Sequence, residues 1–155
     1  MRTWSIARAI ATGTLAVGLL DGLDAVVFFG LRGARPGRIF QGIASGLLGP
    51  ASFEGGTATA LLGVALHFTV ACGIVSTYVL ASRRVTALGE RPWTFGPPYG
   101  VVAYAVMNRI VIPLSAIGHA PAFALWPFLN GLLIHALVIG PISALVASRI
   151  SPRLP

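Results

Sequence analysis

The sequence predicts an all-α polytopic membrane protein with four transmembrane helices and an interfacial or re-entrant helix in the first outer loop. Two observations carry this fold class. Of the 155 residues, 55% are hydrophobic and only 10% are charged, whereas roughly 25% are charged in an ordinary soluble domain. Four apolar segments are also each long enough to supply the about 20 helical residues that cross a bilayer core. Because these segments take up most of the chain, we expect residues 1–155 to form a single transmembrane domain.

The four predicted spans cover approximately residues 9–29, 57–81, 96–118 and 125–147. The first follows a short basic run and has the apolar character of a signal peptide. Asp21 and Asp24 stand where a cleavage region requires small neutral residues, so we expect this segment to be retained as a helix. The last two spans contain Pro113 and Pro141. A proline removes the helical hydrogen bond to the carbonyl four residues earlier, which predicts a kink in each of these spans.

The first loop contains a further apolar stretch at about residues 37–49. Its residues Ile39, Phe40, Ile43 and Leu47 recur at the spacing of one helical face. We interpret this stretch as a helix lying along the outer interface of the membrane. The spacing of small residues in Gly42-x-x-x-Gly46 also permits the alternative, a re-entrant segment packed into the bundle.

The distribution of arginine predicts the orientation, because positive residues favour the cytoplasmic side of a membrane. All 11 basic residues are Arg, and they flank the apolar runs instead of forming a patch, which favours the lipid bilayer as partner and excludes nucleic acid. With four spans, the termini share a side with the second loop. That side carries seven arginines, Arg2, Arg8, Arg83, Arg84, Arg91, Arg149 and Arg153, against Arg32, Arg35 and Arg38 opposite. We therefore expect a multi-pass protein of a bacterial inner membrane with both termini cytoplasmic.

Aromatic residues near the predicted span ends match the belts that form at membrane interfaces. They are Trp4, Tyr78 and Trp93 towards the inner side, and Phe123 and Trp126 towards the outer side.

A layer of polar residues lies at similar depth in all four predicted spans. Ionisable groups inside a membrane are costly and are therefore candidates for function. The members of this layer are Asp21, Asp24, His67, Asn108, Arg109 and His135.

Asp21 and Asp24 share a helix face, because they are three residues apart. Two neighbouring carboxylates in a low-dielectric site require a counter-charge, and Arg109 is the permanent cation at that depth. We therefore expect Arg109 to contact Asp21 or Asp24. Such a pair can simply hold the helices together. One arginine neutralises only one of the two carboxylates, so the other remains available to bind and release a proton, as a proton relay requires.

His67 and His135 occur in a weak internal repeat, each preceded by a glycine in Gly-x-x-x-His. Three interpretations stay open. Each histidine can form a hydrogen bond to a neighbouring helix. Both can ligate a haem iron, with the preceding glycines leaving room for the macrocycle. Both can hold a metal ion together with Asp21 or Asp24.

No catalytic residue is predicted. The sequence contains none of the common nucleotide-binding, hydrolase or metalloprotease motifs. We therefore expect a protein that is not an enzyme: a structural or interaction protein of the membrane, in a homo-oligomer or with a membrane-protein partner. A small transporter or proton path that uses the polar layer is the alternative, and a bis-His haem-binding redox subunit is the third interpretation.

Two segments carry a resemblance to a family. The run Tyr99-Gly-Val-Val-Ala-Tyr-Ala-Val-Met-Asn-Arg-Ile-Val-Ile-Pro-Leu-Ser115, followed by Asn130-Gly-Leu-Leu-Ile-His135, resembles uncharacterised small bacterial four-helix integral membrane proteins, broadly YagU-like. The resemblance implies the fold and transfers no site residue.

Overall fold

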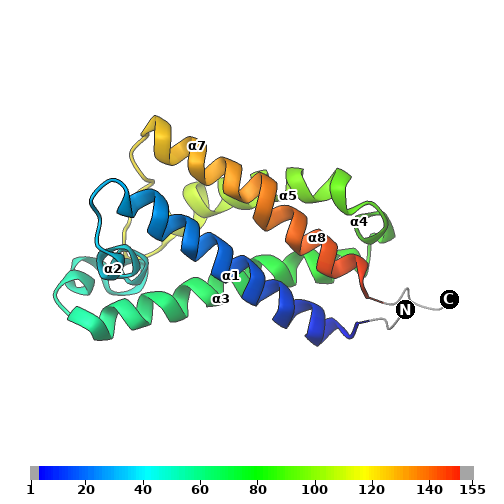
Figure 1. Cartoon of the computed structure of the whole chain (residues 1–155), viewed down its shortest axis with the longest axis horizontal. Helices are drawn as coiled ribbons and strands as arrows, with labels where there is room; N and C mark the ends of the chain where they lie inside the picture. Colours follow the sequence, from blue (N-terminus) through cyan, green and yellow to red (C-terminus); the bar gives the residue numbers. More distant parts are fainter. Residues whose placement is uncertain (1–3, 151–155) are drawn as a thin grey trace.

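The computed structural model describes residues 4–150, which are mainly helical and contain no strand. The helices are α1 (Ile6–Gly30), α2 (Pro36–Leu48), α3 (Gly56–Ser82), α4 (Thr86–Glu90), α5 (Pro92–Val106), α6 (Ile112–Leu114), α7 (Leu125–Ile134) and α8 (Gly140–Ser148). Figure 1 shows the long helices running alternately between two ends of the molecule. At one end, which we call the terminal end, Trp4 N donates to Arg149 O at 2.9 Å. At the other, which we call the α2 end, α2 connects α1 to α3.

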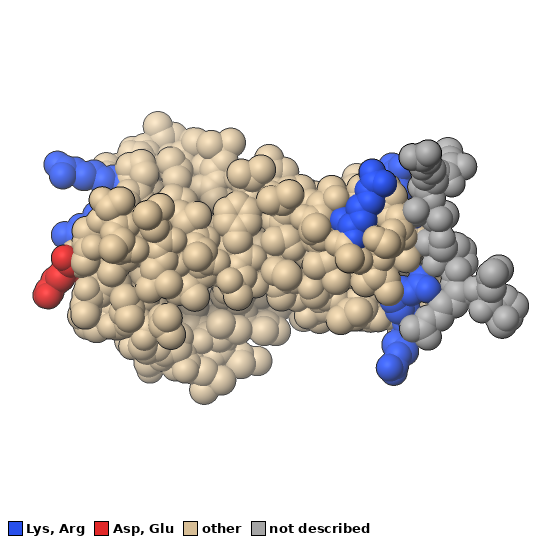
Figure 2. All heavy atoms as spheres, turned by 90° about the horizontal axis from the view of Figure 1, so that it is seen from below, with Lys and Arg blue, Asp and Glu red and all other residues tan. Residues whose placement is uncertain are grey.

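Three helical stretches are long and apolar enough to cross a membrane: Ile6–Gly30, Gly56–Ser82 and Leu125–Ser148. They contain three of the four predicted spans and extend them by one to three residues at the ends that differ. In the face shown in Figure 2, the arginines lie at the two ends of the molecule, and a broad region without charge separates them. This distribution is the one expected of a membrane protein, with charge at both surfaces and an apolar belt between.

The predicted third span, 96–118, is helical over different bounds. The helix runs without a break from Pro92 to Leu114, through a π-helical segment at Met107–Val111. It ends early because Ser115 has an extended backbone, and Gly118 then adopts a φ of 77° that favours glycine. Its prolines, tyrosines, Asn108 and Arg109 lower its hydropathy.

The expected helix in the first loop is present as α2, followed by a 3₁₀ turn at Gly49–Phe53. It packs on the start of α3, where Gly63 faces the backbone of Phe40 and a Cβ on this glycine would lie 2.5 Å from the Phe40 carbonyl carbon. Gln41 Nε2 donates to Gly56 O at 2.9 Å. The close approach therefore depends on Gly63, while Gly42 of the predicted Gly-x-x-x-Gly pair faces open space.

Each proline inside the last two long helices follows a π-helical segment, at Met107–Val111 before Pro113 and at His135–Ile139 before Pro141. Ile112 N donates to Met107 O, and Gly140 N donates to His135 O, which is the i to i−5 pattern. Each proline, which lacks an N–H group, is thus preceded by a π-helical turn in place of an α-helical one.

The hydrophobic core lies towards the terminal end and includes the fully buried Val75, Val79 and Ala144. There α5 packs closely on α8, because Gly96 and Gly140 bring the two backbones together without side chains. Tyr78, expected in an aromatic belt, is 2% exposed in this core. Its hydroxyl donates to Leu88 O at 2.9 Å, so the ring points inwards from α3. Trp93, Phe123 and Trp126 are exposed, as a belt requires.

Candidate functional site: a polar cavity between the helices

A cavity of about 230 Å³ lies inside the bundle, between α1, α2, α3, α6 and the two π-helical segments. Its polar lining consists of Asp21, His67, Asn108 and His135, which are four of the six residues of the predicted polar layer. The remaining wall is apolar. The π-helical segments supply Asn108 and His135, so the prolines that follow these segments help to direct both side chains to the cavity.

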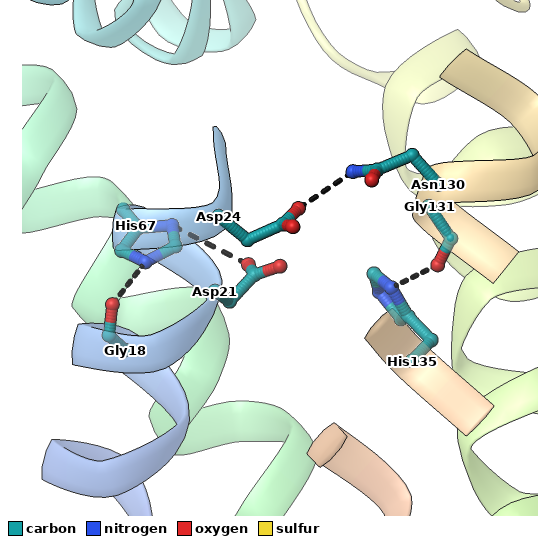
Figure 3. A network of polar contacts seen from close by, with 7 residues as sticks. All are labelled: Gly18, Asp21, Asp24, His67, Asn130, Gly131 and His135. Carbon is teal, nitrogen blue, oxygen red and sulfur yellow. Dashed lines mark hydrogen bonds and ion pairs between the residues drawn. The ribbon is translucent and has the colours of Figure 1, made fainter. Parts of the chain in front are cut away.

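His67 of α3 connects to α1 through both ring nitrogens (Figure 3). Its Nε2 lies 2.8 Å from Gly18 O, and because a carbonyl oxygen only accepts, Nε2 carries the proton. Its Nδ1 lies 3.9 Å from Asp21 Oδ2. The approach is possible because Gly22 has no side chain: a Cβ there would lie 3.3 Å from His67 Nε2. His67 therefore presents Nδ1 to the carboxyl group of Asp21.

His135 faces the same cavity from the opposite side (Figure 3). Its Nδ1 lies 2.8 Å from Gly131 O, one turn earlier in the same helix, so Nδ1 carries the proton and Nε2 is the free nitrogen. Figure 3 shows the carboxyl group of Asp21 directed into the space between the two imidazoles. Each imidazole thus has one nitrogen bonded to a backbone carbonyl and one nitrogen that carries a lone pair.

Asn108 completes the polar lining. Its Nδ2 donates to Tyr104 O at 2.9 Å. The side chain, with its acceptor oxygen, lies at the cavity wall.

Asp24 has a different partner from the expected one. Asn130 Nδ2 of α7 donates to Asp24 Oδ2 at 2.6 Å, which ties α1 to α7 (Figure 3). Asn130 is not among the predicted site residues. The available signal was an amide side chain inside an apolar span, five residues before His135.

The expected contact of Arg109 with Asp21 or Asp24 is absent among residues 4–150. Arg109 is exposed and lines a second cavity of about 640 Å³ at the α2 end, under residues 120–124. Within the π-helical segment Asn108 turns to the polar cavity, and Asp21 and Asp24 use His67 and Asn130 instead. The prediction was wrong because equal depth does not place two side chains on facing sides of their helices.

The two glycines of the Gly-x-x-x-His repeat do not leave open space beside the histidines. The backbone of Phe40 fills the position next to Gly63, and a Cβ on Gly131 would lie 2.6 Å from the ring of Tyr104. The room that motivated a haem is therefore occupied by the protein itself. Within the described part of the chain, no three His, Cys, Asp or Glu residues form a group that can hold a metal ion.

The wall of the polar cavity differs between the side that faces the α2 end and the side that faces the terminal end. Asn108 lines both the polar cavity and the cavity at the α2 end. Towards the terminal end, Val17 and Ile139 line the polar cavity and are each 1% exposed, and the packed core lies beyond them. The site therefore adjoins the cavity at the α2 end at Asn108, beside the apolar side chains of Ile43 and Ile112, and is closed on the terminal side by apolar packing.

Comparison of the chain with family models, with curated proteins and with solved structures gives no match.

Proposed function

We propose that this chain is a four-span protein of a bacterial inner membrane, with both termini cytoplasmic, that exchanges a small solute for protons through its polar cavity. The helix over residues 92–114 is the fourth span. Its 23 residues correspond to about 34 Å at 1.5 Å per residue, which is enough for a bilayer core. The seven-to-three arginine count supports a cytoplasmic terminal end.

The observation that carries the proposal is that two imidazoles and the carboxyl group of Asp21 line one cavity, with one nitrogen of each ring bonded to a backbone carbonyl. His67 donates to Gly18 O and His135 donates to Gly131 O. In their neutral forms His67 therefore keeps a lone pair at Nδ1, which lies 3.9 Å from Asp21 Oδ2, and His135 keeps one at Nε2. A carboxylate and two lone pairs repel one another, and a bound proton removes that repulsion. The cluster of Asp21, His67 and His135 is thus a proton-binding site.

The second element of the proposal is access from one side at a time. A carrier holds its site open to one face of the membrane and closed to the other. The polar cavity adjoins the α2 end at Asn108, while Val17 and Ile139 close it from the terminal end. Thr14, two turns from Asp21 along α1, has a buried hydroxyl oxygen without a hydrogen bond in the described structure. We propose that this hydroxyl is exposed when the site opens to the cytoplasm.

The orientation is tested by fusing alkaline phosphatase and a fluorescent protein to Ala87 and to Pro155. We expect fluorescence and no phosphatase activity at both positions, since phosphatase is active only outside the cytoplasm. Phosphatase activity at either position would overturn the orientation.

The carrier function is tested by labelling single cysteines in a Cys72→Ser background with a membrane-impermeant maleimide, applied to each side in turn. Asn108→Cys should react from the outer side. Thr14→Cys should react from the cytoplasmic side, to an extent that changes with pH in the parent and no longer does so when Asp21→Asn is added. Val79→Cys, buried in the core, is the matched control and should react from neither side. A Thr14→Cys that stays unreactive at every pH would overturn the carrier function.

A structural or interaction protein is the second candidate, and the bond between Asp24 and Asn130 favours it, because this bond links α1 to α7 without lining the cavity. In that case, removing the hydrogen bond between Asn130 and Asp24 should weaken the packing of α1 against α7 and association of the protein with its partners. Asp21→Asn should leave the maleimide reactivity of Asn108→Cys and of Thr14→Cys unchanged.

A further inference from the structure

An apolar groove opens beside the polar cavity, between α3 and the helix over residues 92–114. The groove measures about 390 Å³ and is lined almost entirely by apolar side chains such as Val102 and Val106, which are 57% and 39% exposed. Its terminal end is closed where Tyr99 of α5 donates to Ile74 O of α3 at 2.5 Å. In a membrane this groove faces the lipid chains.

The groove and the polar cavity share part of their walls. Val70, Ile74 and Met107 line both. The two spaces are thus adjacent compartments, one polar and inside the bundle, the other apolar and open to the side. A ligand that occupies both must have a small polar head and a single apolar tail.

The hydrogen-bonding capacity of the polar compartment defines the head. The N–H groups of His67 and His135 are already donated to Gly18 O and Gly131 O, and Asn108 donates to Tyr104 O. What remains towards the cavity is the carboxyl group of Asp21, one lone pair on each imidazole, and the amide oxygen and second N–H of Asn108. The compartment therefore offers mainly acceptors and one acidic group, which complement a cation that carries several N–H donors.

We propose that the two compartments together bind a primary alkylamine, with its ammonium group in the polar cavity and its alkyl chain in the groove. This inference rests on the proposed function and names the class of its solute. The ammonium ion takes the place of the proton that the cluster of Asp21, His67 and His135 otherwise holds. One proton leaves for each ammonium ion bound, so the charge of the site does not change. Of the described side chains that line the two compartments, only these three and Tyr99 titrate.

The binding test uses the full-length protein in lipid nanodiscs and isothermal titration calorimetry, with empty nanodiscs as the blank. We expect n-octylamine to bind, and n-octyltrimethylammonium, which has the charge without N–H donors, to bind at least about tenfold more weakly. 1-Octanol, which lacks the charge, should bind as weakly. Equal affinities for the three probes would overturn the head-group assignment.

Two variants separate the compartments. Asp21→Asn should lower the affinity for n-octylamine by about tenfold or more. Gly73→Leu fills the groove, because Gly73 lines it and a Cβ there meets nothing within 4 Å. Gly73→Leu should lower the affinity for n-octylamine and leave the affinity for n-propylamine unchanged. Gly42→Leu is the matched control, at a helical glycine with the same open space outside the groove, and should have no effect. If Gly73→Leu behaves like Gly42→Leu, the groove does not hold the tail.

The proton balance distinguishes failure of this inference from failure of the proposed function. In weakly buffered solution, a pH-sensitive dye should report release of about one proton per amine bound, from the wild type and not from Asp21→Asn. If amine binds without proton release, the proposed exchange of solute for protons is wrong, and the inferred amine site stands. Absence of amine binding, with pH-dependent labelling of Thr14→Cys intact, would overturn the amine site and keep the carrier.

Discussion

Gly100 is the position at which one methyl group should disturb both the fold and the polar cavity. It lies on α5 against the π-helical segment that carries His135. A Cβ at this glycine would lie 2.5 Å from the carbonyl carbon of His135 and 3.0 Å from the Cα of Ala136. Both are backbone atoms, so no side-chain rotation relieves the contact. Gly100→Ala therefore requires α5 to move away from His135.

The size of the effect follows from these distances. Ordinary van der Waals contact begins near 3.4 Å, so the shortfall at the His135 carbonyl carbon is about 0.9 Å. Overpacking by a methyl group costs about 1–3 kcal/mol when neighbours can adjust, and a backbone contact belongs at the upper limit, about 3 kcal/mol. Gly73→Ala is the matched control, since its Cβ meets nothing within 4 Å. There the higher helix propensity of alanine stabilises by at most about 1 kcal/mol.

The measurement is unfolding in mixed micelles by a rising fraction of sodium dodecyl sulfate, followed by circular dichroism. We expect Gly100→Ala to lower the free energy of unfolding by about 3 kcal/mol and Gly73→Ala to change it by at most about 1 kcal/mol in the opposite direction. Gly100→Ala should also alter the reactivity of Asn108→Cys, since His135 lines the same cavity. Equal effects of the two substitutions would show that α5 and the π-helical segment do not pack in this way.

Three further predictions concern single contacts. Asn130→Ala should cost about 1–2 kcal/mol of stability, and a double-mutant cycle with Asp24→Ala should give a coupling of similar size, because the two side chains share one hydrogen bond; additive effects would contradict the bond. Arg109→Gln should change stability by less than about 0.5 kcal/mol, since Arg109 is exposed and pairs with neither Asp21 nor Asp24; a loss of several kcal/mol in the same denaturation assay would restore the ion pair expected from the sequence. Gly63→Ala should speed hydrogen exchange in α2 by separating it from α3, while Gly42→Ala, with open space at its Cβ, should leave the exchange rates as they are.

The sequence predicted the helices better than their contacts. Apolar length gave three of the four long helices within a few residues, and the one-sided spacing of Ile39, Phe40, Ile43 and Leu47 predicted α2. Depth along each span selected six polar residues, of which four line the cavity. All of these depend on distance along one helix, which the sequence records directly.

The sequence did not indicate how each helix is rotated about its own axis. Arg109 and Asp21 lie at comparable depth, but only the relative rotation of their helices decides whether they meet. The apolar residues surround each long helix almost evenly, so no amphipathic face indicates which side turns inwards. The sequence therefore did not predict that Asp24 accepts a hydrogen bond from Asn130, or that Tyr78, near a span end, is buried in the core.

The rotation is set instead by glycines and by the π-helical segments. Gly96, Gly100 and Gly140 fix how α5 meets the last helix, because only these positions admit a backbone in contact. The extra residue in each π-helical segment then turns the following part of the helix by about 100° relative to an α-helix. Pro113 and Pro141 maintain these segments, since neither can donate the hydrogen bond that would restore the α-helical pattern. The two prolines therefore stabilise the π-helical segments from which Asn108 and His135 line the cavity with Asp21 and His67.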